Sequence, residues 1–208
     1  MLIVQDDRQA NVALEAGELS CSCGGQLRPW GYSARRVVRH RGGAQEHRRW
    51  RRGRCVGCGT THVLAYGVVP RRRDDVSSIG SALLSAGIDG VGHRPIAAEL
   101  AVPASTVRGW LRRARAGAAW IGAQAMRWAH RLDPNLWRRG LLAGPLGEAV
   151  AALGLAASTA ALALGPGLDP WRLAVRFTDG RLLSTPSGRA PLPQPTRARL
   201  HTESATRQ

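Results

Sequence analysis

The sequence predicts a mainly α-helical protein with a small β zinc ribbon near its N-terminus. Two observations support this fold class: four cysteines form two close pairs early in the chain, and apolar residues recur at helical spacing after residue 75. We expect five segments along the chain. They are a flexible lead-in (1–18), the zinc ribbon (19–66), a three-helix helix-turn-helix (75–115), an α-helical C-terminal region (117–183) and a disordered tail (186–208).

The charge of the chain points to a polyanionic partner. The 208 residues include 30 basic and 14 acidic ones, which gives a formal net charge of +16, and every basic residue is arginine. A surface of this sign attracts polyanions, and nucleic acid is the commonest polyanion in a cell. A balanced mixture of charges would serve solubility better. Composition therefore favours a nucleic-acid partner.

The ends and apolar runs of the sequence predict a cytoplasmic protein without membrane association. The first ten residues carry Asp6 and Asp7 and lack the apolar core region of a secretion signal. The Ala- and Gly-rich run at 145–164 is too weakly hydrophobic to be expected to span a bilayer. In a reducing compartment, clustered cysteines are more often metal ligands than disulfides.

The cysteines have the spacing of a tetrahedral metal site. Cys21-x-Cys23 and Cys55-x-x-Cys58 are thirty-one residues apart, glycines follow both pairs, and strand-like segments lie between and after them. We predict that these four cysteines bind Zn²⁺, with His62 as a substitute ligand because the first pair is one residue shorter than usual. Four protein ligands leave no place for a reactive water, so the zinc would be structural. Four unmetallated thiols are the alternative.

Three helices are predicted after the ribbon. They cover 76–87, a segment that starts at Arg94-Pro95, and about 104–114, with a turn at 101–103 between the last two. In the third helix, apolar residues are spaced i, i+3, i+4 and i+7, which predicts one buried face. These residues are Val107, Trp110, Leu111 and Ala114.

The opposite side of the third helix is polar and basic. Ser105, Arg108 and Arg112 recur at helical spacing, and Thr106 and Arg113 flank them. The second helix of a helix-turn-helix enters the major groove of DNA, where arginine contacts guanine. We therefore predict that these five residues contact double-stranded DNA, together with the basic linker residues Arg71, Arg72 and Arg73. An ordinary three-helix bundle with a solvated arginine face is the alternative.

The C-terminal half carries more apolar helix surface than a slim bundle needs. Its tryptophans are more typical of a core or a subunit interface than of base stacking. We therefore expect this half to form helices and to support a homodimer. Asp133-Pro134 and Asp169-Pro170 each combine a helix N-cap with a proline at the first helical position.

No catalytic centre is expected. The acidic residues beyond the linker are scattered, whereas two-metal nucleases and transposases need clustered carboxylates. These residues are Asp89, Glu99, Asp133, Glu148, Asp169 and Asp179. The chain also lacks the lysine of a phosphate-binding loop. We expect neither enzymatic activity nor a small-molecule substrate.

Residues 10–118 resemble actinobacterial helix-turn-helix proteins of unknown function. Those proteins are in turn similar to the zinc-ribbon and helix-turn-helix front end of insertion-sequence transposases. The resemblance implies zinc at the four cysteines and DNA contact through 105–113. The motifs that carry it are Cys21-Ser22-Cys23-Gly24-Gly25, Arg28-Pro29-Trp30-Gly31, Arg54-Cys55-Val56-Gly57-Cys58-Gly59-Thr60-Thr61-His62-Val63-Leu64, His93-Arg94-Pro95-Ile96-Ala97 and Ser105-Thr106-Val107-Arg108-Gly109-Trp110-Leu111-Arg112-Arg113.

Three functions follow from these patterns. The first is a sequence-specific DNA-binding protein, either a transcriptional regulator or a domesticated transposon-derived binder. The second is the DNA-recognition fragment of a truncated transposase. The third is an RNA-binding module, since ribbons and arginine-rich surfaces also bind RNA.

Overall fold

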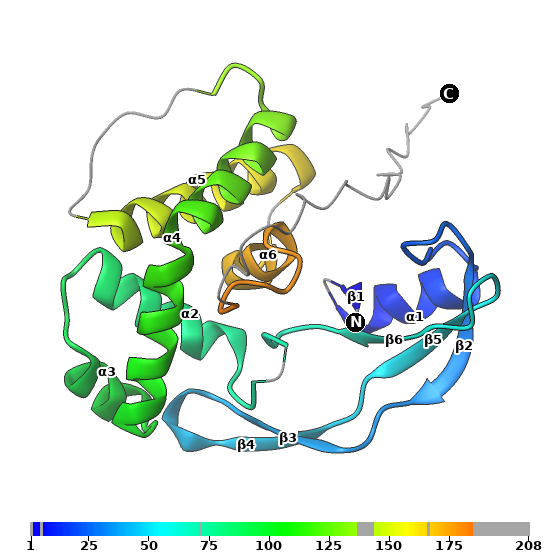
Figure 1. Ribbon diagram of the computed structural model, residues 1–208, viewed down its shortest axis with the longest axis horizontal. Coiled ribbons are helices and arrows are strands. Elements are labelled where there is room, and N and C mark those ends of the chain that lie inside the picture. The colour runs from blue at the N-terminus through cyan, green and yellow to red at the C-terminus, as the bar shows by residue number, and fades with distance from the viewer. Residues whose placement is uncertain (1, 5, 71, 137–143, 166, 185–208) are drawn as a thin grey trace.

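The structure is a computed structural model that describes residues 2–4, 6–70, 72–136, 144–165 and 167–184. A strand-rich N-terminal part lies beside a helical C-terminal part (Figure 1). The predicted tail (186–208) lies outside the described residues. The elements are β1 (Leu2–Ile3), α1 (Asp7–Glu15), β2 (Leu27–Tyr32), β3 (Arg36–Arg39), η1 (Arg41–Gly43), β4 (Gln45–Arg48), β5 (Arg51–Cys55), β6 (Thr61–Ala65), α2 (Val76–Gly87), α3 (His93–Leu100), α4 (Ala104–Leu132), α5 (Gly144–Leu164) and α6 (Pro170–Phe177).

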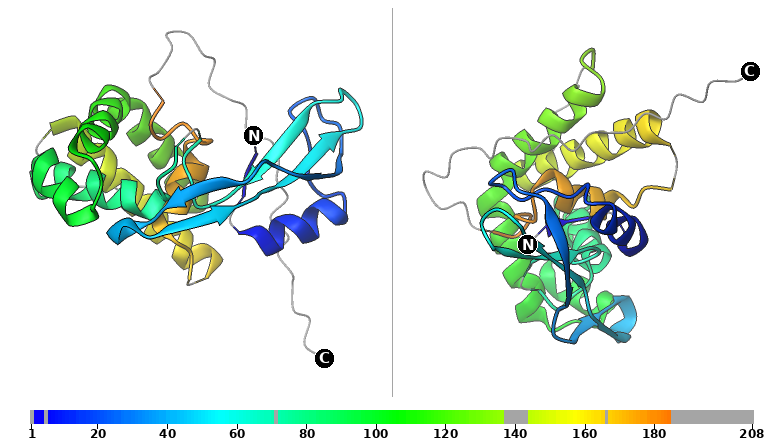
Figure 2. Two further views of the ribbon diagram at one scale, coloured as in Figure 1. Left: turned by 90° about the horizontal axis from the view of Figure 1, so that it is seen from below. Right: turned by 90° about the vertical axis from the view of Figure 1, so that its right-hand side faces the viewer.

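Four strands of the N-terminal part form one sheet in the order β1-β6-β5-β2. β1 is parallel to β6, and the other pairs are antiparallel. The register sets Arg52 opposite Val63 and Arg54 opposite Thr61, so these side chains share one face. The other face carries buried Leu27, Cys55 and Leu64 and packs against α1 (Figure 2).

Residues 1–18 are not the flexible lead-in that the sequence predicts, because β1 and α1 lie within them. The Asp6 carboxylate caps α1 by accepting a hydrogen bond from the Gln9 backbone N–H at 2.7 Å. Ala10 and Leu14, one turn apart, are buried against the sheet. Their partners lie on β2, β5 and β6, about thirteen to fifty residues along the chain, so no local pattern indicates this packing.

β3 and β4 form a separate hairpin that extends from the sheet toward α3 (Figures 1 and 2). η1 forms its tip, where Arg41 makes an ion pair with Glu99 of α3. A Cβ on Gly43 would lie 3.8 Å from the side chain of Ala101, just after α3. The tip of the hairpin therefore contacts the helical part.

The basic linker is fixed to β3. The Arg39 backbone N–H donates to the Arg73 carbonyl at 2.7 Å, and the Asp75 N–H donates to the Arg39 carbonyl at 2.8 Å. The Arg39 guanidinium also bonds the buried Asp74 carboxylate at 2.6 Å. Asp75 then caps α2 by accepting a hydrogen bond from the Ser77 N–H at 3.0 Å. The ribbon thus continues directly into the helices.

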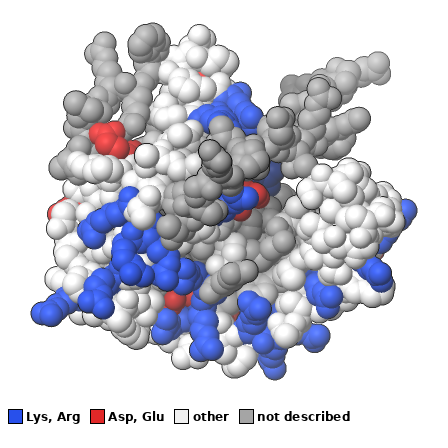
Figure 3. All heavy atoms as spheres, in the orientation of Figure 1, with Lys and Arg blue, Asp and Glu red and all other residues white. Residues whose placement is uncertain are grey.

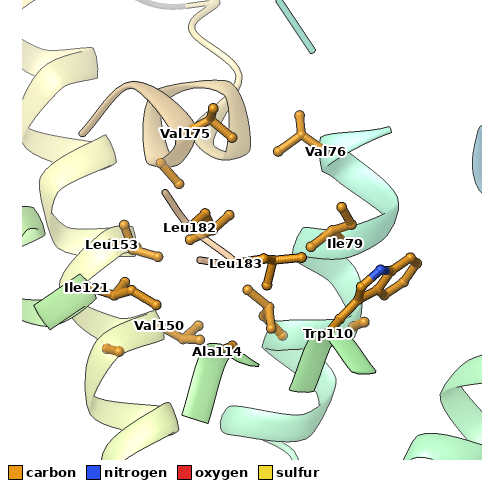
Figure 4. Packing of buried hydrophobic residues seen from close by; sticks show 14 of the residues in the cluster. Val76, Ile79, Trp110, Ala114, Ile121, Val150, Leu153, Val175, Leu182 and Leu183 are labelled. Atoms are coloured by element: carbon orange, nitrogen blue, oxygen red, sulfur yellow. The ribbon is translucent and has the colours of Figure 1, made fainter. Parts of the chain in front are cut away.

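α4 is one continuous helix of 29 residues, so the predicted boundary between 75–115 and 117–183 falls inside it. Its first half packs on α2 and α3, and its second half packs on α5. Gly117, near the predicted helix end, is buried within α4 instead. A single apolar core joins α2 through α6, as Figure 4 shows for Val76, Trp110, Ile121 and Leu153.

The predicted helix breakers behave differently from one another. Asp169 caps α6, as predicted, by accepting a hydrogen bond from the Arg172 N–H at 2.8 Å. Asp133 instead follows the last residue of α4, where its carboxylate accepts from the Asn135 N–H at 3.0 Å. The helix predicted to start there would lie largely in 137–143, outside the described residues.

α5 is more apolar than the sequence interpretation allowed. By length and composition it could cross a membrane, and it is the one such helix in the described parts of the chain. Its most apolar window is 56% buried within the protein, mainly against α4 and α2. Core helices of folded domains meet the same criteria, so this finding is weak evidence for a membrane.

The contact between α2 and α6 depends on a glycine. A Cβ on buried Gly80 would overlap ring carbons of Trp171 at the start of α6. No local pattern in the sequence marks Gly80, because its partner Trp171 lies about ninety residues along the chain.

We predict that Gly80→Ala lowers the free energy of unfolding by about 1–3 kcal/mol, since the added methyl forces Trp171 out of place. Gly154→Ala is the matched control, because Gly154 is exposed in α5 with no atom near its missing Cβ. There the helix propensity of alanine should raise stability by about 0.5–1 kcal/mol. Urea unfolding followed by circular dichroism measures both, and equal effects would contradict the packing.

Candidate metal centre and the outer face of α4

The four cysteines meet at one end of the sheet, although they come from two distant turns. Their sulfurs all lie within 4.8 Å of one another. Cys21 Sγ is 3.7 Å from Cys58 Sγ, and Cys23 Sγ is 3.4 Å from Cys55 Sγ. Thiolates bound at about 2.3 Å to one tetrahedral ion stand about 3.8 Å apart. These four residues can therefore hold a metal ion.

The first turn brings both of its sulfurs to the cluster despite its single intervening residue. The Gly24 N–H donates to the Cys21 carbonyl at 2.9 Å, and the Cys21 N–H donates to the Gly25 carbonyl at 2.8 Å. Gly24 has a φ of +85°, which only glycine adopts readily. A Cβ on Gly25 would stand 2.6 Å from Cys55 Sγ, so this glycine leaves room for the sulfur.

The second turn places amide and hydroxyl donors around its sulfurs. The Cys58 N–H points at Cys55 Sγ at 3.5 Å, and the Thr60 hydroxyl lies 3.3 Å from Cys58 Sγ. Hydrogen bonds from the Thr60 hydroxyl and N–H lower the pKa of Cys58 to about 6. At Cys23 the Gly25 N–H lowers the pKa, but contacts with the other three sulfurs outweigh it and raise the pKa to about 11. Without an ion the thiols thus share protons, which metal binding would release.

His62 lies against the cluster. Its Nε2 is 3.2 Å from Cys21 Sγ, and burial lowers the pKa of its imidazole, which favours the neutral ring that metals bind. Among the described residues, the four cysteines are the one group of three or more potential ligands close enough to share an ion. His62 therefore lies beside the four predicted cysteine ligands.

The predicted inner face of α4 is buried: Val107, Trp110, Leu111 and Ala114 are each at most 1% exposed. On the other side, Ser105, Arg108 and Arg112 are exposed, and Thr106 is half-buried. The structure records no hydrogen bond or ion pair for these three exposed side chains within its described parts.

Arg113 differs from its neighbours because it folds back onto the helix. Its guanidinium donates to the Gly109 carbonyl at 3.1 Å, and a Cβ on Gly109 would stand 3.1 Å from the same nitrogen. Gly109 thus gives the arginine room to lie along α4. Of the predicted linker contacts, Arg73 is exposed, Arg72 is half-buried, and Arg71 lies outside the described residues.

Basic side chains gather on one side of the protein. Figure 3 shows arginines at the lower left and along the lower edge, where Figure 1 places α3, the start of α4 and the β3–β4 hairpin. Few acidic side chains interrupt this area in that view. On the face shown, one large group of basic side chains therefore lies over α3 and the start of α4.

Two exposed aromatic rings of β2 lie beside arginines of β5, an arrangement that the sequence did not predict. Trp30 is 48% exposed with the Arg54 guanidinium 4.7 Å from its ring centre. Tyr32 is 49% exposed, and Arg51 lies 5.1 Å from its ring centre. Aromatic residues at every second position of a strand, beside arginine-rich strands, are the pattern that could have revealed this surface.

Comparison of the chain with models of protein families, with curated proteins and with solved structures finds no match in any of the three. The resemblance to transposase front ends therefore stays an expectation from the motifs.

We predict that Gly25→Ala lowers the metal content of the purified protein, because its Cβ would stand 2.6 Å from Cys55 Sγ. Gly57→Ala is the control in the facing turn, where the nearest atom would be 3.7 Å away. Metal per chain is measured by mass spectrometry after dialysis against a weak chelator. The site would be refuted by equal metal in both variants or by none in the unmodified protein.

Proposed function

We propose that this protein binds double-stranded DNA through a helix-turn-helix formed by α2, α3 and the first half of α4. α3 and α4 are joined by residues 101–103, the short connection that this motif requires. Ala101 adopts a left-handed conformation with a φ of +53°, and Val102 packs into the core. These two features support a fixed angle between the two helices.

The observation that carries the proposal is the outward position of Ser105, Arg108 and Arg112 on α4. Arginines without acidic partners are available for phosphates or guanine edges. Side chains at the start of a recognition helix reach the bases, and all three lie within its first nine residues. Arg41 at the hairpin tip adds positive charge next to the same turn, although Glu99 partly offsets it.

We propose that the four-cysteine cluster holds a structural Zn²⁺. Four thiolates in tetrahedral positions are the donor set typical of structural zinc. The ion would fix the two turns and thereby the open face of the sheet. Reduced thiols also fit a cytoplasmic location, which we include in the proposal.

The homodimer stays a prediction. Leu162 is 89% exposed and Leu164 is 47% exposed at the end of α5, which leaves apolar surface available. A mass for one chain from light scattering at micromolar concentration would contradict it.

Selection of bound sequences from a random duplex pool should yield a preferred site. We expect Arg108→Gln and Arg112→Gln each to weaken binding to that site by about 1–3 kcal/mol if the arginine contacts a base. Arg127→Gln is the control, since at 1.5 Å per residue it lies on the same helix about 28 Å from Arg108 and about 22 Å from Arg112. Binding is measured by fluorescence anisotropy at several salt concentrations.

The same titrations separate the alternatives. An equal loss on random duplexes would reassign the arginine to phosphate contact. Tighter binding to structured RNA than to any selected duplex, at matched salt, would contradict the DNA proposal.

A further inference from the structure

A cavity of about 360 Å³ lies on the face of the sheet opposite α1. It is bounded by strands β5 and β6, by the connection between β2 and β3, and by residues 68–70 and Arg72, which precede α2. The cavity therefore sits where the ribbon meets the helical part. Neither the metal centre nor the outer face of α4 contributes to its wall.

Three arginines line this cavity, and no acidic residue does. They are Arg36, Arg52 and Arg72, from three separate segments. The described residues provide none of the three with an ion pair. Arg72 also lies near Arg113, and burial together with that like charge lowers its pKa. Asp74 acts on Arg72 from outside the wall, but the wall itself carries three cations and no carboxylate, which favours an anion.

Two buried donors beside this cavity have no acceptor. The Trp50 side chain is 5% exposed, and its indole Nε1–H has no hydrogen-bond partner. Arg72 Nε is likewise buried and unpartnered. Because both atoms are closed to solvent, a ligand in the cavity would contact the other guanidinium nitrogens of the arginines instead.

The rest of the wall is apolar. Val63, Ala65, Val68, Val69 and Pro70 line it. Inorganic phosphate would leave this surface without a partner, whereas an organic molecule would cover it. The volume is at the small end of the range for ligand pockets, which suits a metabolite rather than a chain.

We propose that this cavity binds a small organic phosphate monoester, with the phosphate between the arginines and an apolar or aromatic body against 63–70. Guanidinium groups bind phosphate oxygens in pairs. The ligand would join the sheet to the linker that precedes α2. The proposal does not depend on DNA binding.

Isothermal titration with 4-methylumbelliferyl phosphate tests the proposal, with neutral 4-methylumbelliferone for comparison. We expect only the phosphate to bind. Arg52→Gln should weaken its binding about tenfold or more, through loss of a charge-assisted hydrogen bond. Arg35→Gln is the matched control, because Arg35 is exposed, next to Arg36 and outside the cavity wall.

Thermal unfolding of each variant establishes that it is folded, and Arg36→Gln replaces Arg52→Gln if the latter is not. Equal binding of the neutral compound, or equal weakening by Arg35→Gln, would overturn the site. Competition with duplex DNA decides the source of the phosphate. If DNA displaces the probe and Arg52→Gln weakens both, the cavity belongs to a DNA-backbone surface and the small-molecule assignment fails.

Discussion

The burial of one side of α4 is the constraint on which the helical part of this protein depends. Over 29 residues, about 43 Å at 1.5 Å per residue, a single stripe packs first on α2 and α3 and then on α5. A straight helix with one side fully buried must present its other side to solvent. The exposure of Arg108 and Arg112 is therefore a consequence of the core around Trp110 and Ile121, and it does not depend on any local preference of the arginines.

The ribbon is positioned by a second constraint, the attachment of β3 to the linker. Two backbone hydrogen bonds and the ion pair of Arg39 with buried Asp74 leave the linker little freedom. Asp75 is the N-cap of α2, so the attachment of the linker to β3 also fixes where the helical part begins. Arg41 reaches α3 at the far end of the hairpin. The metal site lies at the opposite end of the sheet from this attachment. Loss of the metal should therefore unfold the ribbon before it affects α4.

The sequence predicted the features whose signals are local. The cysteine pairs and the buried face around Trp110 depend on spacing within one turn or one helix, and both were predicted by residue. The packing of Leu14 on the sheet and of Gly80 on Trp171 depends on partners far along the chain, which no window of sequence contains. The end of the third helix shows the same limit: the helix predicted over about 104–114 continues to Leu132 and packs on α5, which lies later in the chain.

The arginines of this protein differ in what they contact. Some are neutralised, as Arg39 is by Asp74; others lie over aromatic rings, as Arg54 does over Trp30. Two groups without an ion pair among the described residues lie on the outer face of α4 and around the cavity beside the linker. Repulsion among such cations costs stability unless an anion binds, so each group implies its own ligand. Because the α4 group is open and convex while the cavity group is recessed beside an apolar wall, the first suits an extended polyanion and the second a small organic anion.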